Sequence, residues 1–195
     1  MSKVFWKGSV LLAPVPAALI TCGTMEKSNI ITIGWTGIIN THPPITYISV
    51  RPERYSHDII KENGEFAINL TTSVMCRKTD FCGVKSGRDT DKFKACDFHK
   101  IKGRVISAPI IEECPVSLEC KVIESKFYGT HTMFIAEIVS VAVDENYIDS
   151  KQKLNLQQCG LASYAHGEYF ALGRKLGDFG FSVRKKKNEK DSSEK

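Results

Sequence analysis

The stretch AALITCGTMEKSNIITIGW, residues 17–35, contains two short apolar runs separated by a polar turn. Both runs are rich in β-branched residues and are shorter than a typical helix, so we expect strands over residues 17–22 and 30–35. The turn between them is too short to hold a crossover helix, which predicts that the two strands pair antiparallel. This pairing sets the fold class that we expect for the rest of the chain.

Further apolar runs of the same kind continue this pattern toward the C-terminus. They predict strands over residues 45–51, 66–70, 116–123 and 133–143. The last two belong to a long hairpin that should turn at Gly129-Thr130. Because closure removes exposed strand edges, repeated short strands of this kind favour a mainly β fold with a few short helices, arranged as a Greek-key-like antiparallel barrel.

The run over residues 116–123 alternates regularly between apolar and polar side chains. Successive side chains of a strand point to opposite faces of the sheet, so Ser117, Glu119 and Lys121 share one face. We therefore expect this strand to have one face in solvent.

Helix signals are few. Pro52 should end the strand before it, Ser56 is the expected N-cap of a short helix, and Asn63-Gly64 supplies a left-handed stop. Two further short helices are expected over residues 73–81 and 90–96.

Length and charge indicate one domain followed by a charged tail. The chain has 195 residues and a formal net charge of +5. Residues 184–195 hold six Lys or Arg against three acids, a net +3, which leaves only +2 for residues 1–183. We expect residues 1–183 to form the domain and residues 184–195 to be disordered. The nearly balanced body gives no reason to expect a nucleic-acid partner.

The cysteine, histidine and hydropathy patterns indicate the cellular compartment and argue against metal sites and membrane spans. Seven cysteines without a CxxC pair fit neither a secreted disulfide framework nor a zinc knuckle, so we expect a cytoplasmic protein. The five histidines lack ligand spacing, so no metal site is expected. No apolar run reaches the roughly 18 residues of a membrane span. The N-terminus resembles a short signal peptide, but Pro14 and Pro16 interrupt it and we treat it as mature structure.

The segment Arg51-Pro-Glu-Arg-Tyr-Ser56 lies where a strand should end and a helix should begin. Unpaired backbone N–H groups and the positive end of the helix dipole meet at such a junction, and Arg51 and Arg54 can add charge-assisted hydrogen bonds. The segment is therefore a candidate phosphate cup. The alternative is that the arginines are solvated and Ser56 is only a cap.

The segment before it, residues 29–40, carries Gly34 and Gly37 inside or beside a strand. Glycine there allows another group to approach the backbone closely, and a flat ring could lie along such an edge. A β-bulge is the alternative explanation. The chain has no GxGxxG, GxxxxGK[ST], HExxH or GxSxG motif, so we expect a cofactor held by polar contacts and no catalytic side chain.

The order of several motifs resembles the flavin reductase-like domain over roughly residues 8 to 183. These motifs are Pro14-Val-Pro16, Asn29 with Thr32-Ile-Gly-Trp-Thr36, His42-Pro-Pro44, residues 51–56 and Glu65-Phe-Ala-Ile-Asn-Leu70. The later stretch Phe81-Cys-Gly83, followed by residues 86–93, is similar to the flavoredoxin branch.

What the resemblance implies is a six-stranded split barrel that forms a homodimer, with FMN bound near the dimer interface. Matched position by position, the isoalloxazine edge would be lined by Thr32, Ile33, Gly34, Trp35, Thr36, Gly37 and Asn40. The ribityl and phosphate groups would be surrounded by Ser49, Val50, Arg51, Arg54, Tyr55 and Ser56. The pocket would be closed by Asn69, Cys82, Gly83, Ser86 and Lys92. Near the C-terminus, His166 or Tyr169 is a candidate to lie over the pocket, and an aromatic core contact is the alternative.

The resemblance further implies an oxidoreductase in which NADH or NADPH gives hydride to FMN, which then reduces flavin or another acceptor. Two alternatives remain: an FMN electron carrier reduced by a protein donor, and a non-catalytic binding module on the same barrel. Cys82 is a candidate redox participant, although a buried cysteine usually acts as a small apolar side chain.

Overall fold

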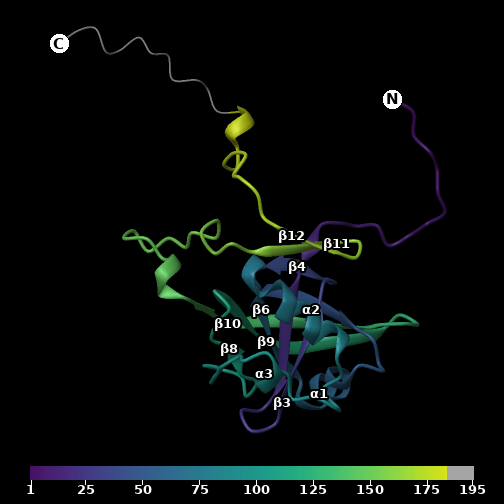
Figure 1. Cartoon of the computed structure of the whole chain (residues 1–195), viewed down its shortest axis with the longest axis vertical. Helices are drawn as coiled ribbons and strands as arrows, with labels where there is room; N and C mark the ends of the chain where they lie inside the picture. Colours follow the sequence, from purple (N-terminus) through teal and green to yellow (C-terminus); the bar gives the residue numbers. More distant parts are fainter. Residues whose placement is uncertain (184–195) are drawn as a thin grey trace.

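β-Branched and aromatic residues build one seven-stranded antiparallel sheet in the computed structural model, which describes residues 1–183 (Figure 1). Its strands, in sheet order, are β3 (Ser28–Ile33), β2 (Ala18–Gly23), β6 (Glu65–Leu70), β9 (Val116–Phe127), β10 (Thr132–Val143), β5 (Pro44–Val50) and β4 (Thr36–Thr41). Several sheet neighbours are not consecutive in the chain, as in a Greek key. The predicted fold class is confirmed.

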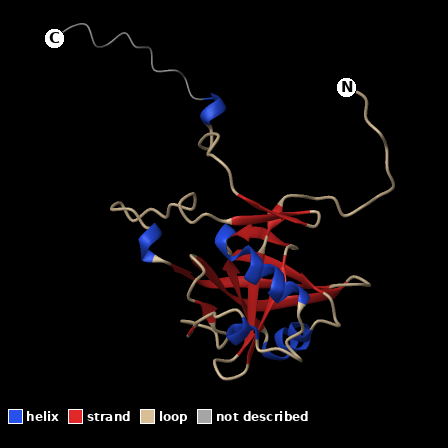
Figure 2. Cartoon of the chain, viewed as in Figure 1, coloured by secondary structure: helices blue, strands red, loops and turns tan. Residues whose placement is uncertain are grey.

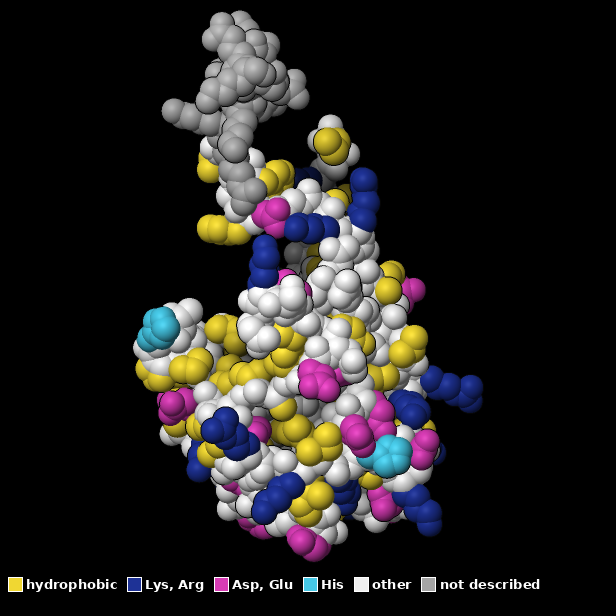
Figure 3. All heavy atoms as spheres, turned by 90° about the vertical axis from the view of Figure 1, so that its left-hand side faces the viewer, with side chains coloured by type: hydrophobic (Ala, Val, Ile, Leu, Met, Phe, Trp, Pro, Cys, Tyr) yellow, Lys and Arg dark blue, Asp and Glu magenta, His cyan; other side chains and the backbone are white. Residues whose placement is uncertain are grey.

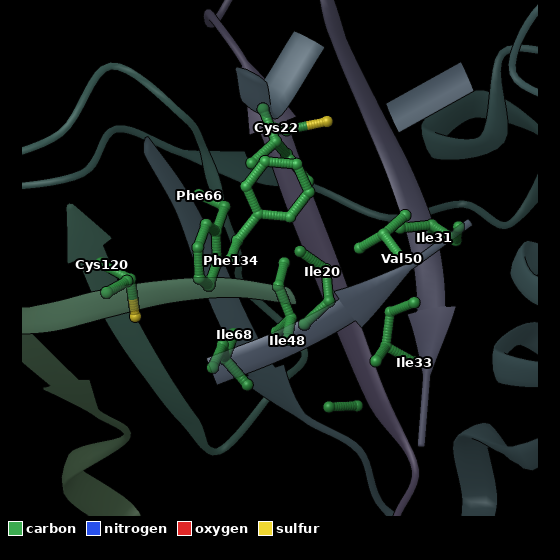
Figure 4. Packing of buried hydrophobic residues seen from close by; sticks show 13 residues of the cluster. Ile20, Cys22, Ile31, Ile33, Ile48, Val50, Phe66, Ile68, Cys120 and Phe134 are labelled. Carbon is green, nitrogen blue, oxygen red and sulfur yellow. The ribbon is translucent and has the colours of Figure 1, made fainter. Parts of the chain in front are cut away.

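The sheet curls until β5 approaches β3. The backbone N–H of Ser49 donates to the carbonyl oxygen of Trp35 at 2.9 Å, which links the end of β5 to the chain just after β3. Side chains from both strands then meet inside the barrel. Figure 4 shows Phe66, Phe134 and Ile20 grouped at its centre, all fully or almost fully buried. Each such side chain contributes about 1.5–3 kcal/mol by leaving water.

Helices cover the outside of the barrel (Figure 2). α1 spans Tyr55–Asn63, α2 spans Cys76–Val84 directly after the 3-10 turn η1 (Ser73–Met75), and α3 spans Lys92–Ala95. α2 and α3 pack on the outer face of β2 and β3 through a second apolar cluster that includes Leu19, Ile30 and Phe93. This packing brings the α2–α3 loop close to the start of α1.

The start of α1 differs from the sequence prediction. The N-cap is Arg54, in an extended conformation without a side-chain capping bond, and Ser56 is a fully buried residue inside the first turn. The prediction of Ser56 as the N-cap was wrong, because its hydroxyl is bonded across the fold instead of to the helix. The predicted stop is confirmed, since Gly64 is left-handed with φ 67°.

Smaller elements lie at the margins. β1 (Val15–Pro16), β11 (Ala162–Ala165) and β12 (Glu168–Ala171) form a three-stranded sheet, and β7 (Lys100–Ile101) pairs with β8 (Ile110–Ile111). The 3-10 turns η2 (Glu145–Tyr147) and η3 (Phe181–Val183) lie on the C-terminal side of β10. Residues 1–9 and 173–183 extend away from the body (Figure 1). The tail predicted over residues 184–195 lies outside the described residues.

The predicted hairpin is confirmed, because β9 and β10 pair along most of their length and Tyr128 N–H donates to the His131 carbonyl at its tip. The predicted solvent face of β9 was wrong for two of its three residues. Ser117 and Glu119 are 2% and 1% exposed. Glu119 accepts hydrogen bonds from backbone N–H groups of the 104–106 segment, which folds over that face.

No helix within residues 1–183 is both long and apolar enough to cross a bilayer.

Candidate functional site

A polar cavity of about 230 Å³ lies where β5 ends and α1 begins, which we call the anion cup. The first-turn N–H groups of a helix have no partner within the helix, and they carry the positive end of its dipole. Around this helix start the cavity wall carries five cationic side chains and one acid. These are Arg51, Arg54, Lys85, Arg88, Lys92 and Glu53. The arrangement suits an anion of more than one charge.

Lys92 forms the floor of the anion cup and is only 4% exposed. Its Nζ donates to the carbonyl oxygens of Ile30 at 2.7 Å and Cys82 at 2.8 Å. An ammonium has three N–H donors, so one remains for a ligand in the cavity that Lys92 lines. Burial lowers the pKa of Lys92 below its ordinary value of 10.5. A bound anion would stabilise the charged form of Lys92 and so offset the free-energy cost of burying the ammonium.

The arginines of the cup also hold its walls together. Arg54 Nη1 donates to the carbonyl oxygen of Gly83 at 3.2 Å, which joins α1 to the end of α2. Arg88 Nη1 donates to the carbonyl oxygen of Glu53 at 3.0 Å, and its guanidinium lies 5.5 Å from the centre of the Tyr55 ring. These contacts fix the α2–α3 loop against the start of α1.

Asn29 and Ser56 line the inner wall of the cup. Asn29 Nδ2 donates to Ser56 Oγ at 2.8 Å, and both residues are buried. Gly87 packs directly on the Asn29 amide, since a Cβ built at Gly87 would collide with Asn29 Oδ1. The loop can approach Asn29 this closely only because residue 87 has no side chain.

A groove of about 210 Å³ leads from the cup along the end of β3. It shares Ile31, Arg51 and Arg54 with the cup and is further lined by Thr32, Ile33, Gly34, Trp35, Ser49, His131 and Tyr164. The Thr32 hydroxyl donates to the Thr79 carbonyl oxygen, so α2 fixes that side chain. The cup and groove together form one channel that is cationic at one end and aromatic at the other.

Beyond the groove is a larger cavity of about 410 Å³, which we call the outer cavity. Its wall shares Trp35 and His131 with the groove, and their rings are 4.7 Å apart with an interplanar angle of 34°. Partial burial, and next the charge of Arg51, lower the pKa of His131 below its ordinary value of 6.5. The imidazole is therefore neutral at pH 7.

The structure brings most of the predicted site residues together. Those in the cup are Arg51, Arg54, Tyr55, Ser56, Ser86 and Lys92. Those along the groove are Thr32, Ile33, Gly34, Trp35 and Ser49, and Thr36 lines the outer cavity. Gly83 contributes backbone, because its carbonyl accepts from Arg54 and its Cα packs against Thr32. Gly37 lies close to the Tyr47 ring, where a Cβ would be 3.2 Å from a ring carbon.

Two predicted residues, one from β4 and one from β5, lie away from the channel. Asn40 is exposed, and its amide donates to the carbonyl oxygen of Pro43 at 3.0 Å. Val50 is fully buried inside the barrel core. Neither side chain lines the cup, the groove or the outer cavity.

Two more predicted residues are buried elsewhere. The Asn69 side chain is fully bonded between strands, donating to the Leu19 carbonyl and accepting from Ile111 N–H and the Ser117 hydroxyl. The Cys82 thiol is buried in the cluster under α2, 3.7 Å from the sulfur of Cys96. Burial, and next Cys96, raise the pKa of Cys82 to about 12. These side chains stabilise the elements that form the channel and do not line it.

The two aromatic candidates near the C-terminus also lie outside the channel wall. His166 is exposed in the turn between β11 and β12. Tyr169 donates to Asp80 Oδ1 at 3.3 Å and packs edge-on against Tyr164, with ring centres 5.3 Å apart. Tyr164, in turn, lines the groove. Tyr169 therefore supports a groove residue from behind.

Sequence reasoning did not assign Asn29, Lys85, Arg88, His131 or Tyr164 to the site. His131 had an available signal, because it follows the predicted hairpin turn. The register of β10 with β5 pairs Thr132 with Val50, which places His131 beside Arg51. The other four depend on contacts between distant segments that no local pattern shows.

Comparisons with known proteins agree with this geometry. Residues 11–173 match the model of the flavin reductase-like domain. Flavoredoxin of Desulfovibrio vulgaris (Miyazaki F) superposes with a TM-score of 0.86 at 29% identity, covering 93% of this chain and 99% of that one. Flavoredoxin from Methanosarcina acetivorans gives a TM-score of 0.84 at 29% identity, with coverage of 91% and 95%.

A third relative is a named enzyme. FMN reductase (NADH) RutF of Pseudomonas syringae pv. syringae is 23% identical over 103 residues, which is 53% of this chain and 56% of that protein. The family match covers most of the described domain and includes β1 to β12. The chain therefore belongs to the flavin reductase-like family, as the order of its sequence motifs predicts.

Proposed function

We propose that this protein binds FMN, with the phosphate in the anion cup and the flavin ring along the groove, and that it acts as an oxidoreductase. The observation that carries the proposal is the buried Lys92 ammonium, which faces the same cavity as the first turn of α1. A phosphate monoester carries about −1.5 to −2 charges at pH 7 and has three acceptor oxygens. The relatives named as flavoredoxins and as an FMN reductase support the same ligand.

The residues of this chain hold and orient the ligand. Lys92, Arg54 and the α1 N-terminus bind the anionic end, so the position of the ring is fixed by the length of the ligand. Thr32 and Ser49 offer polar contacts along the groove, and Trp35 offers an aromatic surface at its outer end. The bound FMN supplies the hydride and electron chemistry, and no side chain has to act as nucleophile.

NADH or NADPH is the proposed electron donor, by analogy with the relative whose name specifies NADH. The neutral imidazole of His131 lies at the end of the groove, where it can donate a hydrogen bond to an amide or carbonyl group of a second ligand. Seven free cysteines fit a reducing compartment, so we place the protein in the cytoplasm.

The phosphate assignment is tested by titrating FMN into the flavin-free protein and following flavin fluorescence. Lys92→Met removes one charge-assisted hydrogen bond, worth about 1.5–3 kcal/mol, so the Kd should rise roughly 10- to 150-fold. Lys94→Met is the matched control, because Lys94 lies on the same short helix and is exposed. If Lys92→Met and wild type bind FMN with the same Kd and unfold at the same temperature, Lys92 does not bind the phosphate.

An FMN electron carrier is the second candidate. A nicotinamide dinucleotide would have to bind in the outer cavity, beside the groove. Its pyrophosphate favours Lys or Arg, and none of the described residues that line the outer cavity is either. Anaerobic stopped-flow mixing of the FMN-loaded protein with NADH and NADPH distinguishes the two. Bleaching of the flavin supports the reductase, whereas no bleaching with either donor supports the carrier.

A homodimer is proposed from exposed apolar surface. Figure 3 shows several patches of hydrophobic side chains on one face of the body, between polar and charged ones. β4 is an edge strand of the main sheet, and its Ile38 and Ile39 are 66% and 49% exposed. An exposed apolar edge strand offers unpaired backbone groups and apolar side chains to which another chain can bind. Analytical ultracentrifugation should give twice the chain mass of 21.8 kDa, and a monomer would contradict this proposal.

A further inference from the structure

The outer cavity has a chemistry distinct from that of the anion cup. Its walls are formed by Trp35, Tyr47 and Met133 from the barrel and by Val10 and Leu12 from the N-terminal segment. Among the described residues that line it, none is Lys, Arg, Asp or Glu. A ligand that fits such walls is apolar and uncharged, because an ion would lose its hydration without gaining a partner.

The outer cavity opens directly onto the groove in which we place the flavin ring. The two share Gly34, Trp35, Ser49 and His131, whereas the cations gather at the opposite end of the channel. With the phosphate in the cup and the flavin ring along the groove, as proposed above, the outer cavity would stay open beside the ring. The volume of about 410 Å³ lies within the range of small-molecule sites.

The polar side chains of the outer cavity are neutral. They are the imidazole of His131 and the hydroxyl groups of Thr36, Tyr47, Ser49, Tyr128 and Thr130. Because the pKa of His131 is lowered, chiefly by partial burial, the ring is an uncharged hydrogen-bond donor at pH 7. Neutral donors between aromatic walls match a carbonyl oxygen on a flat ring better than a carboxylate, which would require a cation.

We propose that the outer cavity binds a flat, uncharged aromatic carbonyl compound of the quinone class, and that this compound is the electron acceptor. The proposal deepens the function proposed above and rests on it. The reaction balances as FMNH₂ plus quinone giving FMN plus hydroquinone, so two electrons and two protons reach the quinone. The aromatic walls hold the quinone ring, and His131 donates to one of its carbonyl oxygens.

The test uses 2,3-dimethyl-1,4-naphthoquinone, which has no free ring position for addition of a thiol. Binding is measured on the full chain with and without FMN. The chain has two tryptophans, and Trp6→Phe leaves Trp35 as the remaining one. Quenching of Trp35 fluorescence should saturate with quinone concentration. Val10→Lys with Leu12→Lys places charge at the cavity wall, and both residues are largely exposed, so the fold is not at risk. The quinone Kd should rise by about tenfold or more.

Val4→Lys with Phe5→Lys is the matched control, because both residues are exposed on the same segment and do not line the cavity. It should leave quinone affinity unchanged. Anaerobic reoxidation of the reduced, FMN-loaded protein by the quinone should saturate with the same concentration dependence. Non-saturable quenching, or equal losses in both double variants, would overturn the proposal.

The FMN affinity of the same variants separates this proposal from the proposed function. Val10→Lys with Leu12→Lys should bind FMN within about twofold of wild type, because the cup is untouched. A large loss of FMN affinity would show that the flavin ring itself occupies the outer cavity, which overturns the quinone site and leaves FMN binding intact. Failure of the wild type to bind FMN would sink the proposed function, while quinone quenching of the flavin-free protein still decides the cavity's ligand.

Discussion

Asn29 donates to Ser56 at 2.8 Å and so joins β3 to the first turn of α1 across 27 residues of chain. Both side chains are buried, and the Gly87 backbone packs on the Asn29 amide. Three segments that form the anion cup therefore meet at one hydrogen bond. The position of the Ser56 hydroxyl, and with it the shape of the cup, depends on Asn29.

Asn29→Ala should weaken both the fold and the cup. A buried hydroxyl that loses its donor costs about 1–3 kcal/mol, so the free energy of unfolding in urea should fall by that amount. FMN affinity should fall roughly tenfold because Ser56 and Gly87 lose their common support. Asn40→Ala is the comparison, since the Asn40 amide contacts only the Pro43 carbonyl. If Asn40→Ala weakens FMN binding more than Asn29→Ala, the ligand lies elsewhere.

FMN affinity should decline at alkaline pH because of Lys92. Burial lowers the pKa of Lys92, so the ammonium loses its proton at lower pH than a free lysine does. Only the charged form attracts the phosphate, and affinity therefore falls as pH rises through that lowered pKa. Fluorescence titrations across the alkaline range should show this decline in wild type and its absence in Lys92→Met. The same alkaline slope in both proteins would assign the effect to another group.

The pKa of His131 should lie below its ordinary value of 6.5, and the charge of Arg51 should contribute to the lowering. Partial burial is the larger cause of the lowered pKa and the guanidinium charge the second, so Arg51→Ala should raise the pKa of His131 part of the way back toward 6.5. Proton NMR of the imidazole ring signals measures this directly. His99, whose pKa is raised by a hydrogen bond to Glu113, should stay unchanged and serves as the internal control. If the pKa of His131 is the same in Arg51→Ala and wild type, the Arg51 charge does not act on the imidazole at the hairpin tip.

The fold was largely predictable because its strands are local features. β-Branched runs mark β2, β3, β5, β6, β9 and β10, and a short polar turn marks the β9–β10 hairpin. The strand β4 was missed, because Ile38 and Ile39 stand on an exposed edge next to Gly37 and give no buried alternation. The burial of Glu119 was missed because the segment that covers it lies far from β9 in the chain. Local patterns do not report which loop folds over a strand.

The site was predictable to the extent that it is contiguous in sequence. Residues 51–56 form a strand-to-helix junction, and that pattern made the segment a candidate anion cup. Asn69 and Cys82 were included by resemblance, yet their polar groups are satisfied or buried in the scaffold. Arg88 and Tyr164 reach the channel only through packing of the α2–α3 loop and of β11. Tertiary packing, which a single sequence does not display, decides these positions.

Glu119 gives a test of acid stability that is independent of any ligand. Its carboxylate is 1% exposed and accepts backbone N–H groups from Arg104, Val105 and Ile106 at 3.0, 2.7 and 3.0 Å. Burial alone would raise the pKa of Glu119, but the three donors outweigh it and hold the pKa below 4.5. The folded-state pKa thus lies below the unfolded one, so the stabilisation is complete above pH 4.5 and is lost as pH falls through the folded value.

Glu119→Gln should therefore destabilise the protein at pH 7 by about 1.5–3 kcal/mol, because the neutral amide replaces a charged acceptor and has a single oxygen. Its unfolding free energy should also vary less with pH below about 4.5 than that of wild type. Urea unfolding at a series of pH values measures both effects. Glu124→Gln, on the exposed half of the same strand, should match wild type in both respects. Equal acid sensitivity of Glu119→Gln and wild type would mean that other carboxylates dominate the acid transition and that the three N–H donors do not hold a charged Glu119.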